Sequence, residues 1–225
     1  MNPLIIALDV PSVDEARHLV DALGESIDFY KVGLELYAVA GLSFVQELMD
    51  GGKRVFLDLK LYDIGETVKR ATAAIAQTGV TYLTVHGSRA VMQAAVAGRG
   101  TSPLRLLGVT VLTSFDEEDL KDLGYPCSPA ELVQLRVQNA LAAGMDGLVC
   151  SALEVAGVRK MTGPEAILVT PGVRSSDTAT GDQKRVATPK EALLNGASHL
   201  VIGRQVTRAG DPAAEVRRII QEINS

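Results

Sequence analysis

The chain has 225 residues, of which 47 % are hydrophobic and 22 % are charged, and its net charge at pH 7 is −5. This length favours a single domain over residues 1–225, large enough to bury a core without disulfide or metal staples. The acidic balance lacks the basic footprint of nucleic-acid-binding proteins, so we expect no nucleic-acid partner. Aromatic residues make up only 4 % and tryptophan is absent, which argues against a stacking platform for single strands or sugars.

The cysteines and the first residues indicate a cytoplasmic protein. Cys127 and Cys150 are too few for a disulfide framework and neither belongs to a CxxC pair, so a reducing compartment is expected. The first apolar run has no basic leader and is interrupted by Asp9. It therefore reads as neither a signal peptide nor a membrane span, and we expect no membrane partner.

Eight apolar runs alternate with amphipathic helical stretches along the chain. The first helix is predicted to begin after Ser12, with Glu15 completing a capping box, and to end at Gly24. Continuous Val, Ile and Leu runs without alternation indicate strands buried on both faces. The predicted strands cover residues 4–10, 28–36, 54–62, 82–87, 104–113, 147–152, 166–173 and 199–206.

Eight strand–helix units in this length predict an α/β fold of the (β/α)8 TIM-barrel type. The alternative is a doubly wound open sheet, but the turn after the first strand reads Asp9-Val10-Pro11 and carries no GxGxxG pattern. With so few aromatic residues, we expect branched aliphatic side chains to fill the barrel layers. The segments 114–129 and 174–189 are long for loops, which is typical of functional lids.

Charged residues gather at the predicted carboxyl ends of the strands, where barrel enzymes carry their chemistry. Asp58 and Lys60 are two residues apart on the third strand and so share a face, with Asp63 just beyond them. Lys31 on the second strand and Asp9 on the first reach the same mouth. A buried ion-pair layer that only holds strands together is the structural alternative. Because barrel layers are normally apolar, the pattern favours a reaction centre.

A phosphate site is predicted beside this cluster. Gly203-Arg204 follows the eighth strand, and barrel phosphate sites form after strands seven and eight. Glycine permits close backbone approach and arginine binds phosphate through a planar fork. Arg174 and Gln183, in the loop after the seventh strand, are placed to close over the phosphate, although either could be a solvated loop residue. The net charge of −5 does not prevent cations from gathering locally at one mouth.

The histidines carry a weaker signal. His86 lies at the catalytic end, where a packing role competes with a chemical one, whereas His18 reads as a surface residue and His199 starts the eighth strand at the opposite end. The chain has no HxxH, HExxH or Cys/His grouping, so no transition-metal site is expected.

Residues 58–63 read Asp-Leu-Lys-Leu-Tyr-Asp, which matches the pattern D-x-K-x-x-D. With ALDV around Asp9, YKVGLEL around Lys31, LTS at 112–114, TPGVR at 170–174 and GR at 203–204, the chain resembles the orotidine 5′-monophosphate decarboxylase family along its whole length. The resemblance implies a (β/α)8 homodimer that converts orotidine 5′-monophosphate to UMP and CO2, the last step of de novo UMP synthesis, without metal or cofactor.

The resemblance also implies a role for each matching position. Lys60 is the proton donor to C6 of the pyrimidine, Asp58 lies beside the substrate carboxylate, and Lys31 completes the charged array and contacts the ribose. Asp9 binds the ribose, and Asp63 with Thr67 crosses a dimer interface into the neighbouring site. The remaining substrate-binding positions implied are Ile64, Thr113, Ser114, Pro171, Arg174, Gln183, Gly203 and Arg204.

The chemistry of the reaction agrees with these residue types. Loss of CO2 leaves a carbanion at C6 that the pyrimidine ring delocalises poorly. A fixed ammonium beside C6 stabilises that charge and then supplies the proton. We therefore expect electrostatic preorganisation, with Lys60 held by Asp58 and Asp63, to be the main source of catalysis.

Two other functions remain open at this point. A related sugar-phosphate barrel, a decarboxylase or a synthase, would need Mg2+, for which Glu35 is a candidate ligand. A non-catalytic barrel that binds nucleotides as a sensor is the alternative outside enzymology, since a fold alone does not prove activity. Loss of orotidine 5′-monophosphate in the presence of EDTA would favour the decarboxylase, and no loss would favour the sensor or the sugar-phosphate barrel.

Overall fold

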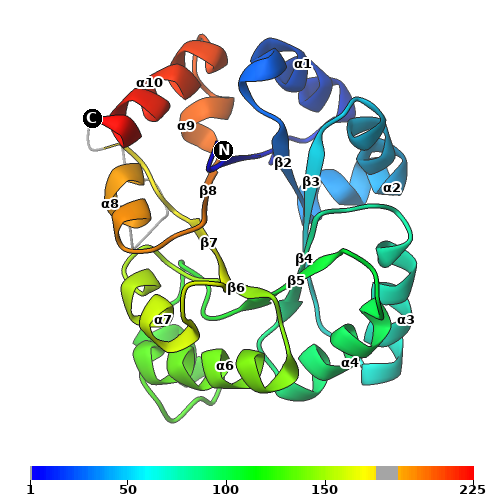
Figure 1. Ribbon diagram of the computed structural model, residues 1–225, viewed down its shortest axis with the longest axis vertical. Coiled ribbons are helices and arrows are strands. Elements are labelled where there is room, and N and C mark those ends of the chain that lie inside the picture. Colours follow the sequence, from blue (N-terminus) through cyan, green and yellow to red (C-terminus); the bar gives the residue numbers. More distant parts are fainter. Residues whose placement is uncertain (1, 176–186) are drawn as a thin grey trace.

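A computed structural model describes residues 2–175 and 187–225, in which parallel strands close into one barrel in chain order, from β1 to β8 (Figure 1). The last strand pairs with the first through Leu4 and Leu200, which completes the ring. The predicted (β/α)8 barrel is therefore confirmed. The strands are β1 Leu4–Ala7, β2 Phe29–Gly33, β3 Arg54–Leu61, β4 Tyr82–His86, β5 Arg105–Val109, β6 Gly147–Val149, β7 Ile167–Pro171 and β8 His199–Ile202.

Helices surround the barrel, and among the described residues none is long and apolar enough to cross a membrane. The first helix begins and ends where the sequence predicts, since the Ser12 side chain accepts a hydrogen bond from the Glu15 N–H and Gly24 forms the C-cap. The helices are α1 Val13–Leu23, α2 Leu34–Asp50, α3 Gly65–Ala76, α4 Arg89–Arg99, α5 Glu117–Asp122, α6 Pro129–Ala143, α7 Val155–Thr162, α8 Pro189–Leu194, α9 Arg204–Thr207 and α10 Pro212–Asn224.

Several predicted boundaries are wrong. The first, fifth and sixth strands end at Ala7, Val109 and Val149, three or four residues before their predicted ends. The run at 28–36 divides at Gly33, where α2 begins, and the run at 199–206 divides at Gly203, where α9 begins. The predicted loop 114–129 contains α5, because Asp116 and Asp119 form a capping box there. After Gly33, Leu34 and Leu36 continue the apolar run from strand into helix, so composition does not mark where the backbone changes direction.

The core has two layers because successive strand residues face opposite sides of the barrel wall. Outward-facing residues such as Leu4 and Ile6 pack under the helices. This double burial explains why the strand sequences are apolar without alternation. The inward-facing cluster consists of Ile5, Ala7, Phe29, Phe56, Tyr82, Leu107, Val169 and Val201.

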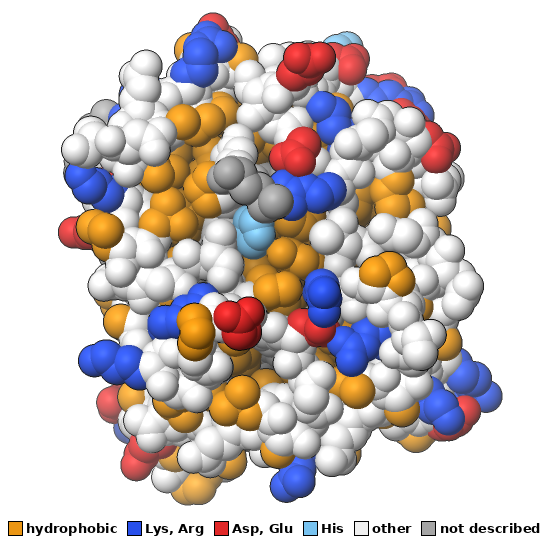
Figure 2. Space-filling model, viewed as in Figure 1, with side chains coloured by type: hydrophobic (Ala, Val, Ile, Leu, Met, Phe, Trp, Pro, Cys, Tyr) orange, Lys and Arg blue, Asp and Glu red, His pale blue; other side chains and the backbone are white. Residues whose placement is uncertain are grey.

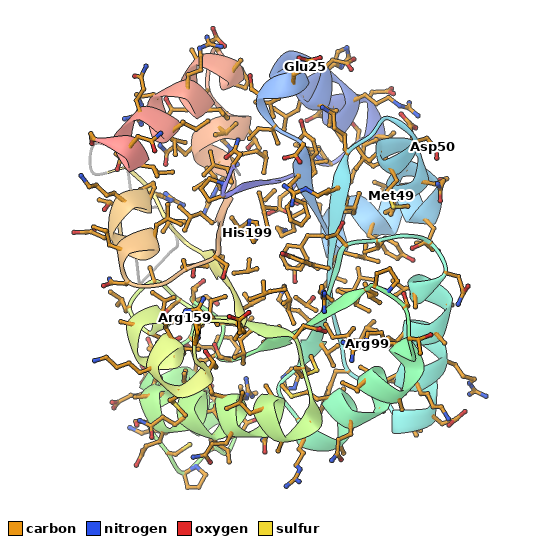
Figure 3. All side chains as sticks on the ribbon, viewed as in Figure 1. Glu25, Met49, Asp50, Arg99, Arg159 and His199 are labelled. Atoms are coloured by element: carbon orange, nitrogen blue, oxygen red, sulfur yellow. The ribbon has the colours of Figure 1, made fainter. Side chains whose placement is uncertain are left out.

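The expectation of purely branched barrel layers is wrong, because aromatic rings fill the amino-terminal end of the barrel. Phe29 meets Tyr82 edge to face at 5.1 Å between ring centroids, and His199 packs against both rings. His199 lies inside the ring of strands in Figure 3, and its Nε2 shares a 3.1 Å hydrogen bond with the Tyr82 hydroxyl. These rings form a floor opposite the carboxyl ends of the strands. Two of the chain's few Phe and Tyr residues, Phe29 and Tyr82, thus fill this end of the barrel together with His199.

Charges on the outer surface are mixed in sign. On the face drawn in Figure 2, Lys and Arg side chains are interspersed with Asp and Glu side chains and do not form a patch of one sign. Arg54 belongs to such a mixture, because it pairs with Asp28 at 2.9 Å while its guanidinium lies 4.3 Å from the centroid of the Phe29 ring.

The barrel floor makes stability depend on pH. Burial, followed by the charge of Arg54, lowers the pKa of His199. As the pH falls, the unfolded chain therefore takes up a proton at this imidazole before the folded chain does, so the free energy of unfolding decreases below a pH of about 6.5. We expect H199Q, which keeps a polar partner for Tyr82 but does not titrate, to show a shallower decrease in urea unfolding between pH 7.5 and 5.5. H18Q, which replaces an exposed imidazole on α1, should keep the wild-type slope, and an equal slope in H199Q would contradict this account.

Candidate active site

A cavity of about 720 Å3 opens at the carboxyl ends of the strands, opposite the aromatic floor. Strand ends on several sides of the barrel contribute to its wall. Charged residues line one side and apolar residues such as Val109 and Val149 line the other. Of the predicted site residues, the cavity is lined by Asp9, Lys31, Asp58, Lys60, Thr113, Ser114, Pro171, Arg174, Gly203 and Arg204.

Four of these side chains form a row of alternating charge. Lys31 Nζ lies 2.8 Å from Asp9 Oδ1 and 3.7 Å from Asp58 Oδ2, and Lys60 Nζ lies 2.9 Å from both carboxylate oxygens of Asp58. The predicted convergence of these four residues is therefore confirmed. Parallel strands bring them together because the carboxyl ends of β1, β2 and β3 meet at one mouth.

Asp58 is the most constrained member of the row. Its side chain is only 13 % exposed. Burial alone would raise its pKa, but the charges of Lys31 and Lys60, with hydrogen bonds from Lys60 and Thr84, outweigh burial and hold the pKa below its ordinary value. Asp58 is thus a carboxylate at neutral pH, and each neighbouring ammonium has a fixed negative partner.

The backbone at Lys60 departs from the predicted regular strand. Lys60 has φ of +49° and is the only residue other than glycine with positive φ in the described chain. The pairing of β3 with β4 shifts register between Leu57 and Leu61. A bulge of this kind aims a side chain in a direction that a regular strand does not offer. The sequence gives no sign of it, because no glycine or proline marks the position.

The part of the cavity where the sequence predicts a phosphate site contains two guanidinium groups. Arg174 follows β7, Arg204 follows Gly203 at the end of β8, and both line the cavity. Burial, followed by the positive charge of Arg204, lowers the pKa of Arg174. Two positively charged side chains therefore line this part of the cavity, which is the kind of lining that favours an anionic ligand. Gln183 lies outside the described residues, and Gln205 and Arg208 line the same region although the sequence analysis did not single them out.

Three predicted positions lie outside the cavity of their own chain. Asp63, Ile64 and Thr67 are exposed, and Asp63 Oδ1 accepts a 2.6 Å hydrogen bond from the Ile64 N–H. Among the described residues Asp63 forms no ion pair with Lys60, so the expectation that Asp63 holds Lys60 is wrong within a single chain.

His86 lies beside a second, smaller cavity of about 310 Å3. Its ring packs against Tyr62 at 4.4 Å between centroids. Burial, followed by the charge of Arg136, lowers the pKa of His86. The Arg136 guanidinium itself donates to the Thr110 carbonyl and to the Tyr125 hydroxyl. These contacts make His86 a packing residue of the neighbouring wall.

Glu35, the candidate magnesium ligand, is in the first turn of α2 and lines the main cavity. Within residues 2–175 and 187–225, no group of three or more His, Cys, Asp or Glu side chains is placed to share a metal ion.

Comparison with known proteins adds an independent finding. Residues 2–219 match the family model described as Orotidine 5'-phosphate decarboxylase / HUMPS family. The chain is 52 % identical over 220 residues to a Rhodopseudomonas palustris protein named orotidine 5'-phosphate decarboxylase, with 98 % of this chain and 94 % of the relative covered. A Nitrobacter winogradskyi protein of the same name is also 52 % identical, with 98 % and 92 % covered.

Solved structures agree with the fold. The crystal structure of orotidine 5'-phosphate decarboxylase from Lactobacillus acidophilus matches with a TM-score of 0.87 at 35 % identity, and all of both chains is covered. An uncharacterized conserved protein from Geobacillus kaustophilus matches with a TM-score of 0.85 at 37 % identity, covering 99 % of this chain and all of the other.

The charge row makes a prediction about stability. In D58N, Lys60 loses its carboxylate partner and Lys31 keeps only Asp9, so the free energy of unfolding should fall by about 2–3 kcal/mol. Urea unfolding at pH 7 measures this change. D14N is the matched control, because Asp14 is paired with Arg17 on an exposed helix face where an ion pair contributes about 0.5 kcal/mol or less. A loss in D58N no larger than in D14N would show that the row is not a stabilising unit.

Proposed function

We propose that the charge row Asp9–Lys31–Asp58–Lys60 carries out the reaction of the orotidine 5'-phosphate decarboxylase family, to which the chain belongs. That reaction converts orotidine 5'-monophosphate to UMP and CO2, which is the final step of de novo UMP synthesis. The enzyme is a carboxy-lyase. The observation that carries the proposal is the position of Lys60, whose Nζ is fixed at 2.9 Å from both oxygens of Asp58 and faces the cavity.

Lys60 supplies the positive charge and the proton. As the bond between C6 and the carboxylate breaks, its electron pair stays on C6 and CO2 leaves. The Lys60 ammonium stabilises that charge, transfers a proton from Nζ to C6, and is reprotonated from water. Because Asp58 already holds the ammonium in place, little reorganisation is needed as the charge develops.

Asp58 acts on the other side of the same step. Its depressed pKa keeps it ionised, so it faces the substrate carboxylate as a like charge. That repulsion disappears when the carboxylate becomes neutral CO2. The larger contribution to lowering the barrier is assigned to the Lys60 ammonium. Neither group requires a metal or a cofactor.

The other cavity residues bind the parts of the substrate that do not react. Arg174, Gly203 and Arg204 bind the phosphate, and Asp9 with Lys31 binds the ribose hydroxyls. The site is completed by pyrimidine contacts at Thr113, Ser114 and Pro171, and by Gln183, whose role rests on the family resemblance. Binding energy from the phosphate is thereby available to offset repulsion at the reacting carbon.

We also propose that the chain, as one domain over residues 1–225, works as a cytoplasmic homodimer without nucleic-acid or membrane partners. Exposed apolar side chains beside the cavity support this, since Tyr62 is 66 % exposed and Ile64 is 77 % exposed. A second copy would cover them and would bring its own Asp63, Ile64 and Thr67 to the mouth of the neighbouring site.

Replacing the proposed proton donor tests the mechanism. K60A should fold but lose at least about 10⁴-fold in kcat, because it lacks both the proton and the fixed charge. The assay follows the absorbance of orotidine 5'-monophosphate with EDTA present. K160A, which removes an exposed lysine on α7, should retain wild-type turnover. Near-normal turnover in K60A would rule out the assigned role.

The phosphate assignment predicts a selective loss. R204A should lower kcat/KM for orotidine 5'-monophosphate by about 10–100-fold, the size expected when a charged hydrogen bond is removed. The residual turnover of orotidine, which lacks the phosphate, should not change. R217A, on the exposed face of α10, is the matched control. An equal loss of kcat/KM for both substrates would contradict the phosphate assignment and would indicate a structural role for Arg204.

A further inference from the structure

Thr84, in the middle of β4, joins Asp58 and Lys60 of the charge row although it does not line the cavity. Its residue surface is fully buried. The Oγ1 hydroxyl donates to Asp58 Oδ1 at 2.8 Å and accepts from the Lys60 backbone N–H at 2.9 Å. A single hydroxyl thus serves the side chain of one residue and the backbone of the other.

The bulge in β3 explains why that hydroxyl is needed. The ladder pairs Leu57 with Leu83 and next pairs Leu61 with Val85. Three residues of β3, 58–60, therefore lie opposite the single residue Thr84 of β4. The Lys60 N–H has lost its regular partner in the ladder, and the Thr84 hydroxyl takes the place of a backbone carbonyl.

The conformation of Lys60 is unfavourable by itself. A lysine at φ +49° is in the left-handed region, which costs free energy for a residue with a side chain and persists only where the surroundings impose it. On β4, the Thr84 contact to the Lys60 N–H is the side-chain hydrogen bond that holds this backbone. The same hydroxyl also orients the Asp58 carboxylate, which accepts a hydrogen bond from Lys60 Nζ.

We propose that Thr84 is a positioning residue for the decarboxylation, whose hydroxyl fixes the β3 bulge and thereby aims the Lys60 ammonium at the reacting carbon. The inference rests on the proposed role of Lys60. Thr84 acts through Lys60 and Asp58 and makes no contact with the substrate. Its loss should therefore affect the chemical step and leave binding of the phosphate and ribose in place.

Three variants of the full-length enzyme test this inference. T84V keeps the shape of the side chain but lacks the hydroxyl, so kcat should fall about 10–100-fold while KM changes less than about 3-fold. T84S retains the hydroxyl and should stay within about 3-fold of wild-type kcat. T72V is the matched control, because Thr72 in α3 is also fully buried and its hydroxyl has no hydrogen-bond partner among the described residues. T72V should leave both kinetic constants unchanged.

Urea unfolding of each variant separates positioning from folding. If T84V is not recovered as a folded protein, T84A provides the same comparison with T84S. Wild-type kcat in the folded variant without the hydroxyl would overturn the proposal. So would a loss that merely follows the folded fraction, or a loss that T84S shows equally.

K60A in the same assay separates this proposal from the one on which it rests. Slow turnover in K60A with normal turnover in T84V would reject Thr84 alone. Normal turnover in K60A would reject the assigned role of Lys60 itself, and the positioning role with it.

Discussion

A buried carboxylate between two ammonium groups sets the geometry of the whole mouth of the barrel. Asp58 is 13 % exposed, and its ionised form is stable there only because Lys31 and Lys60 lie on either side of it. Each lysine is therefore held close to Asp58. Lys31 Nζ also forms an ion pair with Asp9 Oδ1, at 2.8 Å. A Cβ at Gly33 would lie 2.9 Å from Lys31 Nζ and 3.1 Å from Asp9 Oδ1, so a side chain at this position would displace the ends of these two residues. The charges therefore position one another with little help from the loops.

The barrel separates stability from chemistry along its axis. The aromatic rings of Phe29 and Tyr82, with His199, close the amino-terminal end, where dense packing stabilises the fold. At the carboxyl end, the interior of the barrel is occupied by the 720 Å3 cavity and the charged residues that line it. Phe56 lies between the two regions and lines the cavity from below. The buried charges at the carboxyl end are thus supported by a core whose packing at the amino-terminal end does not depend on them.

The sequence predicts those features that follow from strand periodicity and from parallel topology. Apolar runs identify the barrel, and parallel strands then require Asp9, Lys31 and Asp58 to meet at one mouth. The bulge at Lys60 is not predictable, because register depends on contacts with Thr84 in the next strand and leaves no compositional mark. The sequence does not predict the aromatic floor for a related reason. Which strand residues point into the barrel and which point outward depends on the register of the strands. Ile64 is 77 % exposed, so the described chain shows no contact that would test its predicted place in a binding site.

The two ends of the cavity differ in their electrostatic relation to the substrate. In the proposed function, Arg174 and Arg204 line the end of the cavity that receives the phosphate, so attraction between opposite charges acts as soon as the substrate binds. In the same proposal, the ionised Asp58 faces the substrate carboxylate at the other end, and that repulsion is relieved only when CO2 leaves. Attraction at the phosphate is therefore present in the ground state, whereas relief at C6 belongs to the transition state. In this account, binding energy gained at the arginines holds the carboxylate against Asp58 until the bond breaks, and the relief of repulsion in the transition state lowers the barrier.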